Sequence, residues 1–249
     1  MTTPTNYYYA NLCTEMYEIL HPTAPQDELA FYLSHAREGD RMLEPLCGSG
    51  RFLVPFLERG FNAAGMDSSA EMLAKLRAKA PEAEVECADL LTWTPKRTYD
   101  YVFITSGSMS LFTDPEACRR ILEKMKAALA PEGVFVFEVD TVATSLPDDA
   151  DWRTSVEVKT PEGFDLVLKS KNRWEGDTRI QYSPSIYELR REGEILKREP
   201  MDFQIRLYAP GEMEALLHEV GFGTVRTYGS YAKTPATGIE EMFLFECRV

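Results

Sequence analysis

Several common features are scarce in this sequence, and each scarcity excludes a class of protein. The 249 residues include five cysteines, an odd number with no C-x-x-C pair, so neither a disulfide framework nor a zinc site is indicated. No apolar run approaches the roughly 18 residues that a membrane span needs, which argues against a membrane partner. The first nine residues are polar and rich in tyrosine, unlike a signal peptide. We therefore expect a cytoplasmic protein.

Basic residues and histidines are also few. There are 27 Lys and Arg against 40 Asp and Glu, a net charge of −13; such a surface repels phosphate backbones and predicts no nucleic-acid partner. The three histidines, His21, His35 and His218, fall on or beside expected helices rather than at strand ends. We expect them to be structural and assign no catalytic residue. The length of 249 residues allows one large α/β domain, or a domain with one insertion, and the hydrophobic content of 44% is ordinary for a globular protein.

The most informative stretch runs from residue 41 to residue 69. A short apolar run leads into Glu44 and then a turn with Gly48 and Gly50, followed by a helix-like segment and a second apolar run that ends at Asp67. This pattern predicts strand, glycine turn, helix and strand. Glycine allows a tight turn and close approach of a ligand to the backbone. A carboxylate at the end of the second strand can accept hydrogen bonds from both hydroxyls of a ribose.

The nearest competing motif is the dinucleotide fingerprint G-x-G-x-x-G, which would indicate a nicotinamide-dependent oxidoreductase. Leu53 stands where the third glycine should be. That glycine permits close helix–strand packing over a pyrophosphate. Its absence therefore favours a ribose-bearing ligand without a pyrophosphate.

Glu44-x-x-x-Gly48-x-Gly50, with Asp67 17 residues further on, resembles the cofactor motif of the class I S-adenosylmethionine-dependent methyltransferases. The resemblance implies that S-adenosyl-L-methionine is the cofactor. It places the glycine turn beside the methionine part of the cofactor and Asp67 on both ribose hydroxyls. It also implies in-line attack on the sulfonium methyl by a nitrogen, oxygen or carbon nucleophile.

The same resemblance assigns further cofactor contacts. Met72 would lie beneath the adenine, Asp89 would accept from the adenine amino group, and Leu90 would cover the ring; ordinary core and turn roles are the alternatives. The expected cofactor-binding residues are Tyr17, Glu44, Gly48, Gly50, Asp67, Ser68, Met72, Asp89, Leu90 and Ser106. Thr105-Ser106-Gly107-Ser108 replaces the Asn-Pro-Pro-Tyr type motif of the branches that methylate DNA bases and protein glutamine. This removes support for those acceptors and leaves a small molecule.

The expected fold is α/β: a Rossmann-like, seven-stranded, mostly parallel sheet with helices on both faces and its last strand antiparallel. Residues 1–140 and 209–249 would form this domain. Residues 1–40, with Tyr7, Tyr8 and Tyr9, would supply either a helical lid or a packed helix. Period-two alternation and three turn signals predict about four antiparallel strands in an insertion at 141–208. The insertion would cover the substrate or mediate a homodimer. A cofactor-binding protein without turnover remains an alternative to an enzyme.

Overall fold

The computed structural model describes residues 9–249; Tyr7 and Tyr8 lie outside the described residues. Seven strands form the main sheet in the order β11-β12-β5-β4-β1-β2-β3. The strands from β5 to β3 pair in parallel, and β12 is antiparallel to both of its neighbours. Their bounds are β1 Arg41–Pro45, β2 Asn62–Asp67, β3 Val85–Cys87, β4 Tyr99–Ile104, β5 Leu129–Asp140, β11 Thr224–Tyr228 and β12 Met242–Arg248. The expected sheet is confirmed, including its antiparallel last strand.

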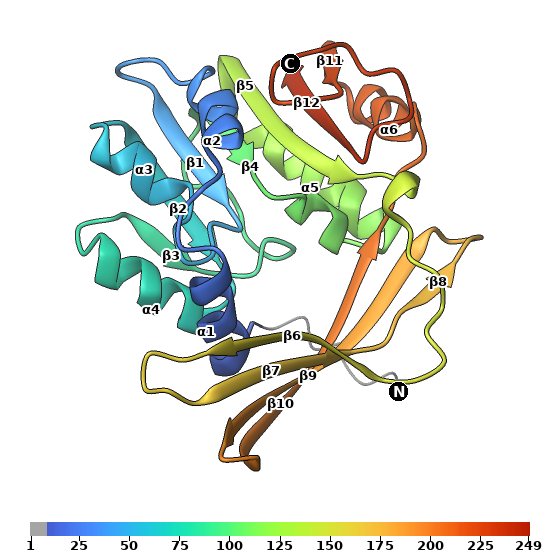
Figure 1. The fold of residues 1–249 in the computed structure, drawn as a ribbon. Coiled ribbons are helices and arrows are strands. Elements are labelled where there is room, and N and C mark those ends of the chain that lie inside the picture. Colours follow the sequence, from blue (N-terminus) through green and yellow to red (C-terminus); the bar gives the residue numbers. More distant parts are fainter. Residues whose placement is uncertain (1–8) are drawn as a thin grey trace.

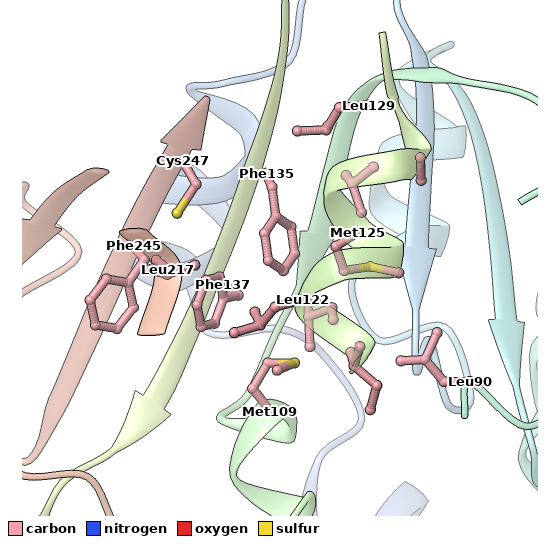
Figure 2. Close-up of a cluster of buried hydrophobic side chains, with 14 of the residues drawn as sticks. Leu90, Met109, Leu122, Met125, Leu129, Phe135, Phe137, Leu217, Phe245 and Cys247 are labelled. Atoms are coloured by element: carbon pink, nitrogen blue, oxygen red, sulfur yellow. The ribbon is translucent and has the colours of Figure 1, made fainter. Parts of the chain in front are cut away.

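Helices cover both faces of this sheet (Figure 1). The helices of the described residues are α1 Asn11–Leu20, α2 Gln26–Leu33, α3 Leu53–Glu58, α4 Ala70–Lys79, α5 Pro115–Ala128 and α6 Glu212–Val220, with 3-10 turns η1 Ser108–Leu111 and η2 Val142–Thr144. All of the α-helices except α1 pack on the main sheet. Alternate residues of β5 point to opposite faces. Phe135 and Phe137 pack toward Leu122 of α5 and Leu217 of α6, as Figure 2 shows. Val136 belongs to the other core, which α2, α3 and α4 cover.

Local signals fix where the helices begin. Asp114 caps α5 by accepting from the Glu116 amide, and Pro115 occupies the first turn, where its missing N–H costs nothing. Ser69 caps α4 by accepting from the Met72 amide at 3.1 Å. Helix α2 ends at Leu33, and Ser34 follows as its C-cap. Among the described residues, no helix combines the length and hydropathy needed to cross a bilayer.

The segment after β5 forms a separate antiparallel sheet in the order β10-β9-β7-β6, with β8 also paired to β9. Its strands are β6 Arg153–Lys159, β7 Asp165–Ser170, β8 Arg173–Glu175, β9 Ile180–Arg191 and β10 Glu194–Arg206. About four strands were expected, and five are present. The difference arises because residues 171–172 separate β7 from β8. Both of these strands pair with successive parts of the single long strand β9.

Helix α1 packs on this inserted sheet rather than on the main one. Leu12, Cys13 and Met16 share a core with Leu166, Tyr187 and Met201. The Leu12 amide also donates to Glu199 Oε2 at 2.7 Å. In Figure 1, α1 lies between α4 and the inserted sheet. The N-terminal helix and the insertion, more than a hundred residues apart in sequence, therefore form one packed unit beside the main sheet.

Candidate functional site

A cavity of about 940 Å³ opens at the carboxyl ends of β1, β2 and β4. The order of the main sheet reverses between β1 and β4, which is where open α/β sheets bind ligands. Tyr17 from α1 lines one side of the cavity. Ile180 and Tyr182 of β9 and Gln204 of β10 line it from the inserted sheet. The cavity therefore lies between the main sheet and the unit formed by α1 and the insertion.

Asp67 ends β2 at one side of the cavity. One of its oxygens accepts from the Gly48 amide at 2.9 Å and the other from the Ser69 amide at 2.8 Å. Burial raises the pKa of Asp67, and these amides partly oppose that rise. A carboxylate offers about four lone-pair sites, so each oxygen can accept one more hydrogen bond. The geometry suits a vicinal diol such as a ribose.

The two glycines of the turn have different roles. Gly48 has φ 52 and lines the cavity; a Cβ there would lie 3.6 Å from the Met72 methyl. Gly50 has φ 82 but is not among the described lining residues. A Cβ at Gly50 would lie 2.8 Å from Leu76 and 2.9 Å from Val54. Gly50 thus allows its turn to pack against α3 and α4, and it lies outside the described lining of the cavity.

Glu44 is buried at the end of β1 and lines the cavity. Its Oε1 accepts from the Thr105 hydroxyl at 3.1 Å, whereas the buried Oε2 has no hydrogen-bond partner in the described part of the chain. Burial raises the pKa of Glu44 well above its ordinary value, and the bond from Thr105 opposes this. A buried carboxylate oxygen without a donor is costly. An ammonium group in the cavity would satisfy it.

Arg51 supplies a cation to the cavity that Glu44 also lines. It lines the cavity with Tyr17, and its Nη2 lies 4.0 Å from Glu28 Oε2. Burial raises the pKa of Tyr17, and the neighbouring Arg51 lowers it in part. Guanidinium and hydroxyl donors together suit a carboxylate. The residues therefore fit an amino acid end, with its ammonium toward Glu44 and its carboxylate toward Arg51.

The other expected contacts fall along the same cavity. Ser68, Met72, Asp89 and Leu90 all line it. Asp89 is exposed, and its Oδ1 accepts from the Leu91 amide at 2.8 Å. Leu90 is 2% exposed and also belongs to the core beneath β5. This side of the cavity therefore offers an exposed carboxylate beside apolar side chains, as a purine site requires.

Sequence reasoning missed several lining residues. Arg51 directly follows the glycine turn, a position that could have suggested a ligand contact. Tyr9, which was expected in the N-terminal lid or helix but not among the cofactor contacts, also lines the cavity, and its carbonyl accepts from the Ser69 hydroxyl at 2.8 Å. No local pattern marks Tyr182 or Gln204, which reach the cavity only because the inserted sheet folds back over it.

Ser106 lies where β4 leads into the cavity wall. It has φ 57, and Gly107 follows with φ 64. A left-handed conformation is uncommon for a residue with a side chain and often marks a functional site. The Gly107 amide donates to Glu138 Oε1 at 3.0 Å, and this bond ties the turn to β5.

Comparisons with known proteins agree with this geometry. A family model described as a methyltransferase domain matches residues 42–133. Trans-aconitate 2-methyltransferase of Variovorax paradoxus is 30% identical over 105 residues, 41% of this chain and 39% of that protein. An N,N-dimethyltransferase of Streptomyces fradiae, named for dTDP-3-amino-3,6-dideoxy-alpha-D-glucopyranose, is 24% identical over 52% of this chain and 54% of its own length. The chain thus spans about half or less of these two relatives.

Other similarities extend over the whole chain. The putative methyltransferase YqeM of Bacillus subtilis is 21% identical, with 94% of each chain covered. An S-adenosylmethionine-dependent methyltransferase of Clostridium acetobutylicum has a TM-score of 0.75 at 16% identity, covering 94% of this chain and 96% of that one. The sugar N-methyltransferase KedS8 of Streptoalloteichus has a TM-score of 0.74 at 20% identity, covering 100% and 99%. At these identities the solved structures support the fold.

The sheet order, the strand-end acid and the buried acid beside a glycine turn define a Rossmann-like domain that binds a nucleoside carrying an amino acid group. Residues 42–133 match a methyltransferase domain, and the chain shares the fold of S-adenosylmethionine-dependent methyltransferases. These findings support a class I methyltransferase family, with S-adenosyl-L-methionine as the cofactor.

Proposed function

We propose that this methyltransferase transfers a methyl group to an amine nitrogen of a small polar molecule. The observation that carries the proposal is the extent of the cavity. It runs from Asp67 and Glu44 to a wall formed by Tyr182 and Gln204 of the inserted sheet. Its volume of about 940 Å³ is within the range of small-molecule pockets. Once the cofactor occupies one end, the remaining space suits a small acceptor better than a polymer.

The chemistry of the wall favours nitrogen as the acceptor atom. The polar groups that line this part include hydroxyls and an amide, from Ser106, Ser108, Tyr182 and Gln204, and the cavity is also lined by Asp114 and Arg120. No histidine lines the cavity in the described part of the chain. An alcohol would need a strong base to become a nucleophile, whereas a neutral amine already carries a reactive lone pair. Two relatives are named as N-methyltransferases of sugars or amino sugars, which adds support.

When bound, S-adenosylmethionine supplies a methyl group already activated on a sulfonium. The chain's own residues supply position. Asp67 would hold the ribose, while Glu44 and Arg51 would hold the amino acid end. Aligning two reactants can contribute on the order of 7–11 kcal/mol. We propose that the insertion, residues 141–208, closes the acceptor side, while α1 serves as a lid that is also a packed helix.

A carboxylate acceptor is a second candidate. Arg120, on α5, lines the cavity and has no ion-pair partner within residues 9–249. A free guanidinium can bind a carboxylate. One relative is a trans-aconitate 2-methyltransferase. This candidate predicts methyl esters that hydroxylamine cleaves, whereas N-methyl products resist it.

Incubating the protein with radiolabelled methyl donor and a panel of small amines, amino sugars and carboxylic acids tests these proposals. We expect label in amines, and none in the same amines after N-acetylation. Label only in acids would replace the amine by the carboxylate. Binding of the cofactor without any product would support the non-catalytic alternative instead.

A further inference from the structure

The hydroxyl of Ser106 lies between the cavity and a buried carboxylate. Ser106 lines the cavity, and its Oγ donates to Glu28 Oε1 at 3.4 Å. Glu28 is in the first turn of α2, is 6% exposed, and is not among the described lining residues. The Ser106 hydroxyl therefore connects the cavity to this carboxylate by a hydrogen bond.

The backbone at this point is held in an unusual conformation. Ser106 has φ 57, which disfavours a residue with a Cβ. The next amide, of Gly107, donates to Glu138 Oε1, and Tyr231 donates to Glu138 Oε2 at 2.8 Å. A Cβ at Gly107 would lie 2.8 Å from Asp140 Oδ2. Neighbouring elements thus maintain a left-handed turn that directs the Ser106 hydroxyl to Glu28.

We propose that Ser106 and Glu28 form a proton relay for the acceptor nitrogen, an inference that rests on the amine acceptor proposed above. When the nitrogen lone pair forms the new bond to carbon, the bond from that carbon to sulfur breaks and its electron pair stays on sulfur. The nitrogen then carries a positive charge and one surplus proton. That proton passes to Ser106 Oγ as the serine proton passes to Glu28 Oε1. A neutral amine and a protonated Glu28 result, with no change of oxidation state.

The surroundings of Glu28 make it a suitable proton acceptor. Burial raises its pKa, whereas Arg51 at 4.0 Å and the bond from Ser106 lower it. A base whose pKa lies nearer the working pH is more effective than an ordinary carboxylate. Within residues 9–249, the other charged or titratable groups that interact with it are Asp27 of the same helix, Glu44 of β1, Glu138 of β5, Tyr17 of α1, Tyr32 of α2, and Tyr231 between β11 and β12.

Glu28→Gln tests the relay, because an amide oxygen can still accept from Ser106 but cannot take its proton. We expect kcat to fall about a hundredfold, the lower end for a lost general base. Affinity for S-adenosylhomocysteine, measured by calorimetry, should stay within about twofold, since Glu28 is outside the assigned cofactor contacts. Ser106→Ala should lower kcat to a similar extent. The matched control is Asp27→Asn, which removes one charge from the same turn at an exposed position.

The pH profile separates a relay from a merely structural role. In wild type, kcat/KM should rise through the pKa of Glu28 as the pH increases. Glu28→Gln should lose that limb and keep the limb that belongs to the acceptor amine, while Glu28→Asp should retain both. The titration of Glu28 can be followed independently as the carboxyl band absent from the variant in infrared difference spectra.

The outcomes are distinct. A Glu28→Gln enzyme with unchanged kcat and unchanged pH profile would overturn the relay, as would a loss of cofactor affinity equal to the loss of kcat. If wild type methylates no amine at all, the proposed function fails first. If wild type methylates amines and the variants do so equally well, only the relay fails.

Discussion

The carboxylate of Glu44 in β1 accepts a hydrogen bond from the hydroxyl of Thr105, just after β4, at 3.1 Å. The bond joins the ends of two neighbouring parallel strands at the point where the sheet order reverses. It uses one carboxylate oxygen and leaves the other, buried, without a donor among residues 9–249. The free protein thus holds a buried carboxyl oxygen whose missing hydrogen-bond donor we expect the cofactor to supply.

Glu44→Gln should separate stability from binding. Because burial raises the pKa of Glu44, the folded protein disfavours the charged form, and the neutral amide should leave the free energy of unfolding unchanged or higher near pH 8. Binding of S-adenosylmethionine should weaken about tenfold or more, as loss of one charged hydrogen bond of about 1.5–3 kcal/mol implies. Urea unfolding and calorimetry measure the two effects. Weaker folding with unchanged affinity would show that the acid serves the fold alone.

Asp67 offers the sharpest test of the cofactor site. If both ribose hydroxyls donate to it, Asp67→Ala loses two bonds of about 1.5–3 kcal/mol each and binds at least a hundredfold more weakly. Asp67→Asn should fall between, because only one of its amide atoms can accept. The control is a 2′-deoxyadenosyl cofactor, against which wild type should discriminate and Asp67→Ala much less. Equal discrimination would remove Asp67 from the ribose site.

Glu138 makes the fold sensitive to pH. Burial, with the charge of Glu28, raises its pKa from 4.5 to about 8. Between these values the folded protein binds more protons than the unfolded chain, so the free energy of unfolding should fall as the pH rises, by at most about 1.4 kcal/mol per unit for one group.

Urea unfolding at pH 5 to 8 should show a smaller slope in Glu138→Gln than in wild type. A residual slope is expected, because Glu28 and Glu44 are shifted in the same direction. Glu132→Gln, at an exposed position of the same strand, is the control and should keep the wild-type slope. A Glu138→Gln slope equal to that of wild type would mean that Glu138 is ionised in the folded protein.

The inserted sheet should control acceptor binding without affecting the cofactor. Tyr182 and Gln204 are cross-strand partners that both line the cavity. Replacing Tyr182 by Ala removes apolar area worth about 1–2 kcal/mol, so the KM for the acceptor should rise about tenfold with little change in kcat. Affinity for S-adenosylhomocysteine should not change. Ile195→Ala, exposed near the β9–β10 turn, should behave as wild type, and a Tyr182→Ala effect confined to the cofactor would contradict this assignment.

Much of the cofactor side of the cavity could be predicted from the sequence, because the residues that form it lie close together in the chain. The turn at Gly48 and the acid at Asp67 belong to consecutive strands, and parallel strands bring their carboxyl ends to the same edge. Hydrophobic pattern also predicted the main sheet and the period-two insertion. The role of Gly50 was ambiguous in the sequence, because a glycine in such a turn can serve either a ligand or close packing. In the structure, Gly50 allows Leu76 and Val54 to pack closely against the turn.

The acceptor side was decided only by tertiary structure. Tyr182 reaches the cavity because the inserted sheet folds back over it, and Tyr17 does so because α1 packs on that sheet. The pair Ser106 and Glu28 is 78 residues apart in the chain. Local sequence patterns set the period and ends of an element, but they do not determine which surfaces pack together. The cofactor could therefore be predicted from one contiguous stretch, whereas the acceptor wall and the proposed relay depend on packing between distant segments.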